Sequence, residues 1–179
     1  TYFDKGAVTI NGKVLSNFDK KGRGKANMQD VLNQSLNTGM IFVEQQMGKT
    51  AFKEYMVNRY KLGERTGVDL PGEVNGRMGS LTGDNDINYA SASFGQGIAT
   101  SPMNIVRGFA ALANGGTMVT PHLATAIVEN SGFTKKLTYP TGNRVLKPET
   151  IARPHAAKYW QDSFGTMDQR EAFTRAGLV

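Results

Sequence analysis

The sequence predicts an α+β domain that is mainly helical and carries a few antiparallel strands. Two β-rich runs flank an Asn-Gly pair near the N-terminus, and several later segments place apolar residues at helical spacing behind a capping residue. Glycine occurs 21 times in 179 residues, which exceeds the average usage of about 7% and is typical of many turns and caps. A chain of this length fits one domain.

The first predicted element is a hairpin over residues 7–15. Its centre is Asn11-Gly12, because this pair supplies the positive φ angles of a type I′ turn. A basic loop follows over residues 20–25. Asn27 then caps a helix, and the negative charge of Asp30 in its first turn interacts favourably with the helix dipole. One face of this helix is expected to carry Met28, Val31, Leu32 and Ser35.

Two more helices are predicted before residue 63. The first follows Asn37, ends near Gly48 and places methionines in the core, with Met40, Val43 and Met47 on one face. The second is expected to start at a Thr50 cap and to end at Gly63. Its inward side chains are expected to be Phe52, Tyr55, Met56 and Tyr60.

Residues 63–86 hold seven glycines or prolines and predict a loop. Ser101-Pro102 opens the clearest helix of the chain, since serine caps well and proline suits the first helical position. Its expected buried face is Met103, Val106, Phe109, Ala110 and Ala113, and residues 114–116 end it. An edge strand is expected within residues 117–128. A further strand, or a hairpin around residues 141–143, is expected within residues 137–146.

Charge and composition narrow the function classes. The net charge is +6, but the basic residues are scattered, which favours a solvated surface over nucleic-acid binding. No apolar run approaches the length of about 18 residues that spans a bilayer, so we expect a soluble chain. Cysteine is absent, and the two histidines lack paired ligand spacing. We therefore expect no metal site and no cofactor.

Five features follow one another in a specific order. They are the N-terminal hairpin, Ser35-Leu36-Asn37, a helix, the loop Gly-Val-Asp-Leu-Pro-Gly-Glu (residues 67–73), and Phe-Gly-Gln-Gly-Ile-Ala before the Ser-Pro helix that ends in Ala-Asn-Gly-Gly (residues 94–116). In this order they resemble the transpeptidase domain of class B penicillin-binding proteins, over about residues 6–150. The resemblance implies an incomplete penicillin-binding/β-lactamase-like fold, with residues 1–150 as its central portion and residues 151–179 as a tail that does not match.

The resemblance also implies a chemistry. In this family the serine of Ser-x-x-Lys attacks a stem-peptide D-Ala carbonyl or a β-lactam and forms an acyl-enzyme. Carried over, Ser35 would relay protons between the lysine and the leaving group, and Asn37 would bind the substrate backbone and orient the lysine. Gly95, Gln96 and Gly97 would form a tight turn beside the cleft. Without the resemblance, Ser35 and Asn37 would be interpreted as helix caps.

Two of the family's three signature elements are missing from the sequence. No serine stands three residues before a lysine, and the nearest imitations, Thr50 to Lys53 and Arg65-Thr66-Gly67, lie at the wrong places in the order. One hypothesis is a fragment of a peptidoglycan D,D-transpeptidase that is inactive in isolation. The alternative is a non-catalytic binding or sensory module. A transpeptidase module of a class A enzyme is a weaker third interpretation.

The resemblance places the parent protein in the cell envelope, at the outer face of the cytoplasmic membrane, with an anchor that this chain lacks. Its implied partners are peptidoglycan stem peptides, β-lactams and cell-wall synthesis proteins such as a glycosyltransferase, without nucleic acid. Residues 151–179 show neither a Lys-Thr-Gly strand nor a clear amphipathic pattern. We expect this tail to pack poorly, to be cut first by proteases, and to leave the monomer marginally stable.

Overall fold

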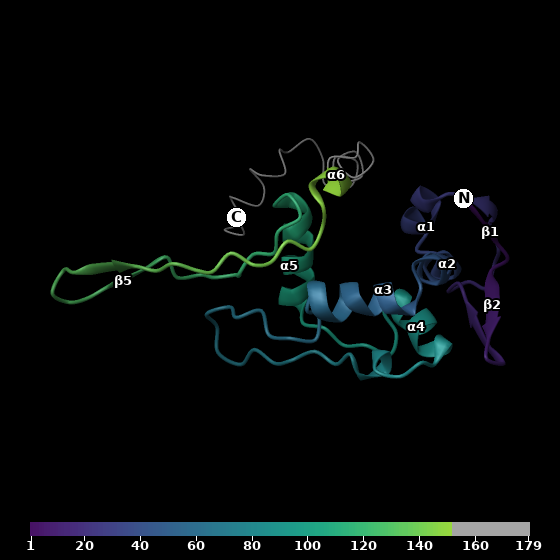
Figure 1. The fold of residues 1–179 in the computed structure, drawn as a ribbon, viewed down its shortest axis with the longest axis horizontal. Coiled ribbons are helices and arrows are strands. Elements are labelled where there is room, and N and C mark those ends of the chain that lie inside the picture. The colour runs from purple at the N-terminus through teal and green to yellow at the C-terminus, as the bar shows by residue number, and fades with distance from the viewer. Residues whose placement is uncertain (152–179) are drawn as a thin grey trace. The chain divides into compact units, whose positions relative to one another are not determined.

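The computed structural model describes residues 1–151 of the chain (Figure 1). These residues divide into two compact units. The first comprises Thr1–Asn58 and Arg77–Ala99, and the second comprises Arg59–Gly76 and the described chain from Thr100 onward. Among the described residues, no helix has the length and apolar character needed to cross a membrane. The predictions made for the tail fall outside the described residues, apart from its first residue.

The first unit contains most of the secondary structure. Its strands are β1 (Tyr2–Asp4), β2 (Ala7–Ile10), β3 (Lys13–Ser16) and β4 (Gly24–Ala26), and its helices are α1 (Met28–Asn33), α2 (Asn37–Met47), α3 (Lys49–Lys53) and α4 (Asp86–Ser93). A short 3-10 helix covers Gly79–Leu81, and α3 continues as a π-helix over Glu54–Arg59. β1 pairs with β4 and β2 pairs with β3, both antiparallel.

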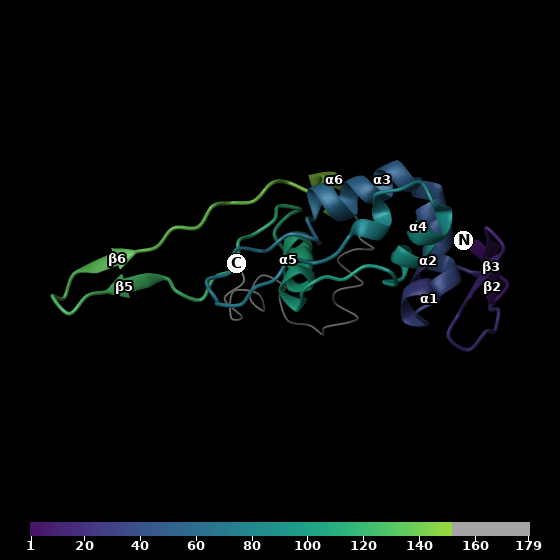
Figure 2. The same cartoon turned by 90° about the horizontal axis from the view of Figure 1, so that it is seen from below.

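The second unit is built around α5 (Pro102–Ala113), with β5 (Ala126–Val128), β6 (Thr134–Lys136) and α6 (Pro148–Ile151). β5 and β6 form an antiparallel pair (Figure 2). Among the described residues the strands thus form only two-stranded antiparallel sheets. The predicted α+β class, mainly helical with a few antiparallel strands, is confirmed.

The elements predicted from local signals are present. Asn11 and Gly12 have φ angles of 49° and 76° in the β2–β3 turn. Asn27 caps α1 in a reciprocal capping box with Asp30. The Ser101 side chain accepts from a backbone N–H in the first turn of α5, with Pro102 at the first helical position. Each of these signals involves residues that are at most four positions apart, so the resulting turn or cap does not depend on distant parts of the fold.

Several expectations about starts and faces were wrong. α3 begins after Gly48, which stands at the cap position, and Thr50 lies inside the helix. α4 was not anticipated, although Asn85 caps it with its side chain. The hairpin of the second unit is centred on residues 129–133, and not on the Thr-Gly-Asn signal of residues 141–143. Met47 of α2 was expected in the core but is 40% exposed.

The faces of α2 and α5 also differ from the expectation. α2 buries Thr38, Gly39, Ile41 and Glu44. α5 buries Asn104 and Arg107 beside Ala110 and Ala111, while Phe109 is 46% exposed. On α5, apolar periodicity fails because Asn104 and Arg107 donate to backbone carbonyl groups on the buried face. On α2, the buried Thr38 donates to the carboxylate of Asp4.

Small apolar clusters hold each unit together. In the first unit, Ile10, Ile41 and Ala90 join the β2–β3 hairpin, α2 and α4, and Ala26, Val31 and Leu36 join β4, α1 and the start of α2. In the second unit, a cluster of Ala111, Met118 and Val145 packs against Tyr60 and Leu146. The cluster of Ala26, Val31 and Leu36 matters most for the site, since it fixes the connection between α1 and α2.

Candidate functional site

Ser35-Leu36-Asn37 forms the connection between α1 and α2. Ser35 has a φ of 50°, a left-handed conformation that is uncommon outside glycine, asparagine and aspartate. Leu36 follows with its side chain fully buried, and its amide donates to the carbonyl of Val31 at 2.9 Å. Asn37 is the first residue of α2. The left-handed conformation of Ser35 therefore turns the chain between α1 and α2. The polar residues Ser35 and Asn37 stand on either side of the buried Leu36.

The two polar residues of this junction have different surroundings. Asn37 Nδ2 donates to the backbone carbonyl of Ser16, at the end of β3, over 2.9 Å. The Ser35 side chain is exposed and makes no hydrogen bond with any described residue. Asn37 is thus oriented by the hairpin, whereas the Ser35 hydroxyl is available to a ligand.

A buried polar cluster lies beneath the first turn of α2. Thr38 Oγ1 donates to Asp4 Oδ1 at 2.7 Å, and the Thr38 amide donates to Asn17 Oδ1 at 3.2 Å. Asn17 Nδ2 donates to both carboxylate oxygens of Asp4. Asp4 and Asn17 are each 1% exposed. The cluster ties the start of α2 to β1 and to Asn17, which directly follows the Ser16 carbonyl that accepts from Asn37.

Asp4 stays ionised in this buried position. Burial by itself raises the pKa of the carboxyl, but hydrogen bonds from the Gly6 amide, Thr38, the Arg23 amide and Asn17 outweigh it and hold the pKa below the ordinary aspartate value. Carboxylates that accept several hydrogen bonds behave in this way. Sequence reasoning missed this cluster. Its one local signal is Asp-x-Gly, an Asx turn in which Asp4 accepts from the Gly6 amide at 2.8 Å.

The turn of Gly95, Gln96 and Gly97 follows α4 in the same unit. The amides of Gly95 and Gln96 donate to the carbonyls of Ala92 and Ser91, both at 3.0 Å. Gly95 and Gly97 have φ angles of 89° and 76°, which glycine adopts without strain. The three residues form a tight, exposed turn. No hydrogen bond links them to Ser35 or Asn37 within the described chain, so their place beside a substrate cleft stays a prediction.

The Gly-Val-Asp-Leu-Pro-Gly-Glu loop is closed by its own carboxylates in the second unit. Glu73 accepts from the amide and the hydroxyl of Thr66 and from the Gly67 amide, at 2.5–3.0 Å. Asp69 accepts from the amides of Leu123 and Ala124, each at 2.7 Å. Arg65-Thr66-Gly67 therefore belongs to a structural loop, and its hydroxyl is already used within that loop.

Nothing in the described part of the chain groups three or more histidines, cysteines or carboxylates in a manner that could hold a metal ion. The chemistry available at the α1–α2 junction is therefore that of a hydroxyl and an amide held at a helix start. Such a pair can position a polar substrate or pass a proton, but it contains no nucleophile with an adjacent base.

Comparison with known proteins decides the family. The family model described as penicillin binding protein transpeptidase domain matches residues 1–159. The chain belongs to this family. Among curated relatives, stage V sporulation protein D of Bacillus subtilis is 31% identical over 151 residues, which cover 84% of this chain and 23% of that protein. The peptidoglycan D,D-transpeptidase MrdA of Salmonella typhimurium is 29% identical over 172 residues, or 89% of this chain and 26% of that protein.

Solved structures agree with this assignment. The crystal structure of penicillin binding protein 3 from Mycobacterium tuberculosis, complexed with aztreonam, has 26% sequence identity and a TM-score of 0.75, and it covers 83% of this chain and 33% of that one. The transpeptidase fold predicted from the motif order is thus confirmed. The chain spans about a quarter of the length of the curated relatives that it matches.

Proposed function

We propose that this chain is the Ser-x-Asn portion of a peptidoglycan D,D-transpeptidase that cross-links stem peptides through a serine acyl-enzyme. The observation that carries the proposal is the position of Ser35-Leu36-Asn37 at an irregular helix junction, in a chain that matches the transpeptidase family over residues 1–159. Relatives named as peptidoglycan D,D-transpeptidases support an enzyme as the parent protein. No observation favours the non-catalytic module.

In this proposal the residues of the junction assist a nucleophile that the chain does not contain. A serine and a lysine from another part of a longer protein would form the acyl-enzyme. The Ser35 hydroxyl, free of partners among the described residues, would pass a proton between that lysine and the leaving group. Asn37, oriented by the Ser16 carbonyl, would accept from or donate to the substrate backbone with its remaining amide groups.

The wider context follows from the same family. The parent protein would act on peptidoglycan stem peptides at the outer face of the cytoplasmic membrane, with other cell-wall synthesis proteins such as a glycosyltransferase. β-Lactams would acylate it, as the aztreonam and ampicillin complexes of a related penicillin binding protein suggest. Gly95, Gln96 and Gly97 would contribute backbone groups to the edge of the substrate site.

Fluorescent penicillin tests the proposal. The 179-residue chain is expected to carry no covalent label after denaturation, whereas a longer parent chain that includes Ser-x-x-Lys is expected to be labelled. In that longer chain, Asn37→Ala should abolish labelling and lower the free energy of unfolding by only about 1 kcal/mol, the cost of one hydrogen bond. Asn33→Ala, at an exposed position of α1, is the matched control and should label normally.

Two results would contradict the proposal. A labelled serine within residues 1–179 of the isolated chain would show that the nucleophile has been misassigned. Normal labelling of the folded Asn37→Ala variant would show that this asparagine only secures the helix junction.

A further inference from the structure

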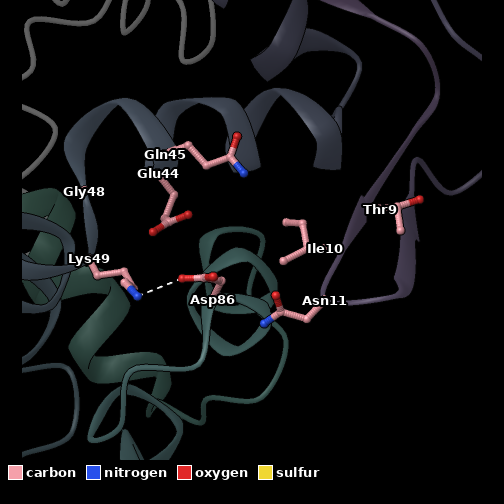
Figure 3. A pocket seen from close by; sticks show the side chains of 8 residues that line it. All are labelled: Thr9, Ile10, Asn11, Glu44, Gln45, Gly48, Lys49 and Asp86. Atoms are coloured by element: carbon pink, nitrogen blue, oxygen red, sulfur yellow. Dashed lines mark hydrogen bonds and ion pairs between the residues drawn. The ribbon is translucent and has the colours of Figure 1, made fainter.

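A polar cavity lies on α2, away from its first turn. Its volume is about 440 Å³, and it is bounded by the C-terminal half of α2, the tip of the β2–β3 hairpin and the start of α4, all in the first unit (Figure 3). Ile10 forms an aliphatic wall, Asn11 and Gln45 supply amide groups, and Glu44 and Asp86 supply carboxylates. The cavity therefore joins apolar and anionic surfaces at a size suited to a small ligand.

Glu44 is the unusual member of this lining. The residue is 4% exposed, and its carboxylate forms no hydrogen bond and no ion pair with any described residue. Figure 3 shows the carboxylate directed toward the space between α2 and Asp86. Burial raises the pKa of Glu44, and the charge of Asp86 adds to the effect. A buried carboxylate without a partner is costly, and a cationic ligand in the cavity would remove that cost.

The nearby lysine does not supply the missing partner. Lys49 Nζ contacts Asp84 Oδ1 at 2.5 Å, Asp86 Oδ1 at 2.7 Å and the Asp84 carbonyl at 3.1 Å. An ammonium group has three donors, and these three acceptors use all of them. Lys49 attracts Glu44 through space, but it has no N–H left to donate to it.

We propose that this cavity binds a primary ammonium group carried on a short aliphatic chain. The ammonium would donate to Glu44 and to the unshared oxygen of Asp86, and the alkyl chain would lie against Ile10. A divalent cation is disfavoured because only two carboxylates reach the cavity and the Lys49 ammonium stands beside one of them. An anion is disfavoured because Lys49 is already neutralised. The site is independent of the proposed transpeptidase function.

The binding should depend on the ionisation of Glu44. The groups that face it are Asp86 on α4, Lys49 on α3 and, through Lys49, Asp84; the hairpin supplies only Thr9, Ile10 and Asn11, none of which titrates. An alkylammonium remains charged up to about pH 10. Affinity should therefore rise as the pH passes upward through the pKa of Glu44 and should be lost below it.

Nuclear magnetic resonance on the 179-residue chain tests the proposal with n-butylamine as the probe. At pH 7.5, with ionic strength matched by sodium chloride, the amide signals of Asn11, Gln45 and Gly48 should shift saturably, with a dissociation constant on the order of 1 mM. n-Butanol, the neutral probe of similar shape, should bind at least tenfold more weakly. Glu44→Gln should weaken n-butylamine binding at least tenfold, whereas Glu129→Gln, an exposed change in the other unit, should leave it unchanged.

A measurement on the unaltered chain guards against misfolding of Glu44→Gln. The side-chain carboxyl ¹³C signal of Glu44 should report a lower pKa in saturating n-butylamine than in sodium chloride, because a bound ammonium favours the ionised form. Equal affinities for n-butylamine and n-butanol would overturn the proposal. An unchanged pKa of Glu44 in the presence of the amine, or undiminished binding by a folded Glu44→Gln chain, would overturn it as well.

Discussion

Replacing Asp4 by alanine should destabilise the first unit more than any change of a surface carboxylate. Asp4 accepts from the Gly6 amide at 2.8 Å, the Thr38 hydroxyl at 2.7 Å, the Arg23 amide at 3.0 Å and Asn17 Nδ2 at 3.0 Å. Asp4→Ala leaves the Gly6 and Arg23 amides without an acceptor in a site where Asp4 itself is 1% exposed, while Thr38 and Asn17 each lose one of their two acceptors. Removing one member of such a buried charged network costs about 3–5 kcal/mol.

This loss can be measured by urea unfolding followed by circular dichroism. With a dependence on urea of about 2 kcal/mol per M, the midpoint should fall by about 1.5–2.5 M. Asp19→Asn is the matched control, because Asp19 forms a more exposed ion pair with Arg23 in the same region. Its midpoint should stay close to that of the unaltered chain. Equal midpoints for Asp4→Ala and Asp19→Asn would refute the idea that the buried cluster holds the start of α2.

The same cluster predicts an acid dependence. The pKa of Asp4 is lowered in the folded chain, so the unfolded chain binds the proton more tightly. Its stabilising contribution is therefore complete above the unfolded value near 4 and is lost as the pH falls through the depressed folded pKa. The difference in unfolding free energy between the unaltered chain and Asp4→Ala should shrink over that acid range. A difference that does not change with pH would show that Asp4 acts through packing alone.

Three further changes test other parts of the structure. Ser101→Ala should cost about 1 kcal/mol of unfolding free energy, since it removes the side-chain acceptor at the start of α5, and Ser101→Asp should restore thermal stability. Glu73→Ala should cost about 1–2 kcal/mol by freeing the Thr66 and Gly67 amides, and limited proteolysis should then cut faster within residues 67–72. Gly116→Ala should lower the free energy of unfolding by about 3 kcal/mol or more, because the φ of Gly116 is 88° and a Cβ there would collide with the Leu146 carbonyl. Gly115→Ala is the control. Gly115 has a φ of 60° and open space around it, so the loss in the same thermal melts should be about 1 kcal/mol.

The sequence predicts those features whose cause is local. The Asn-Gly turn, the Asn27 capping box and the Ser-Pro start of α5 each depend on a few adjacent residues. The position of Ser35-Leu36-Asn37 between two helices was also predictable, because two helical patterns flank it. The left-handed conformation of Ser35 was not, since nothing in the residue type requires a φ of 50°.

The features that the sequence did not reveal depend on distant partners. Asp4, Asn17 and Thr38 lie far apart in the sequence and become a cluster only when β1, the segment after β3 and α2 meet. Glu44 has the spacing of a core position of α2 but the chemistry of a surface residue, so periodicity cannot place it. In both cases a polar side chain occupies a buried position, and only the folded chain shows what satisfies it or leaves it unsatisfied.

Buried polar side chains serve irregular backbone in the second unit as well. The chain after the π-helix turns through Lys61, whose φ is 52°, and several carbonyls of this segment accept from side chains. Arg107 donates to the carbonyls of Tyr60 and Lys61, Asn104 donates to that of Glu64 at 2.7 Å, and Thr100 donates to that of Leu62 at 3.0 Å. An apolar face on α5 would remove the side-chain donors of the Tyr60 and Glu64 carbonyls, whereas the Lys61 carbonyl also accepts from the Glu64 amide at 3.0 Å. The Ser-x-Asn junction has a related arrangement. The left-handed step at Ser35 is followed by Thr38, whose amide and hydroxyl donate to the buried Asn17 and Asp4, and side chains held by such hydrogen bonds are positioned more precisely than those on a flexible loop.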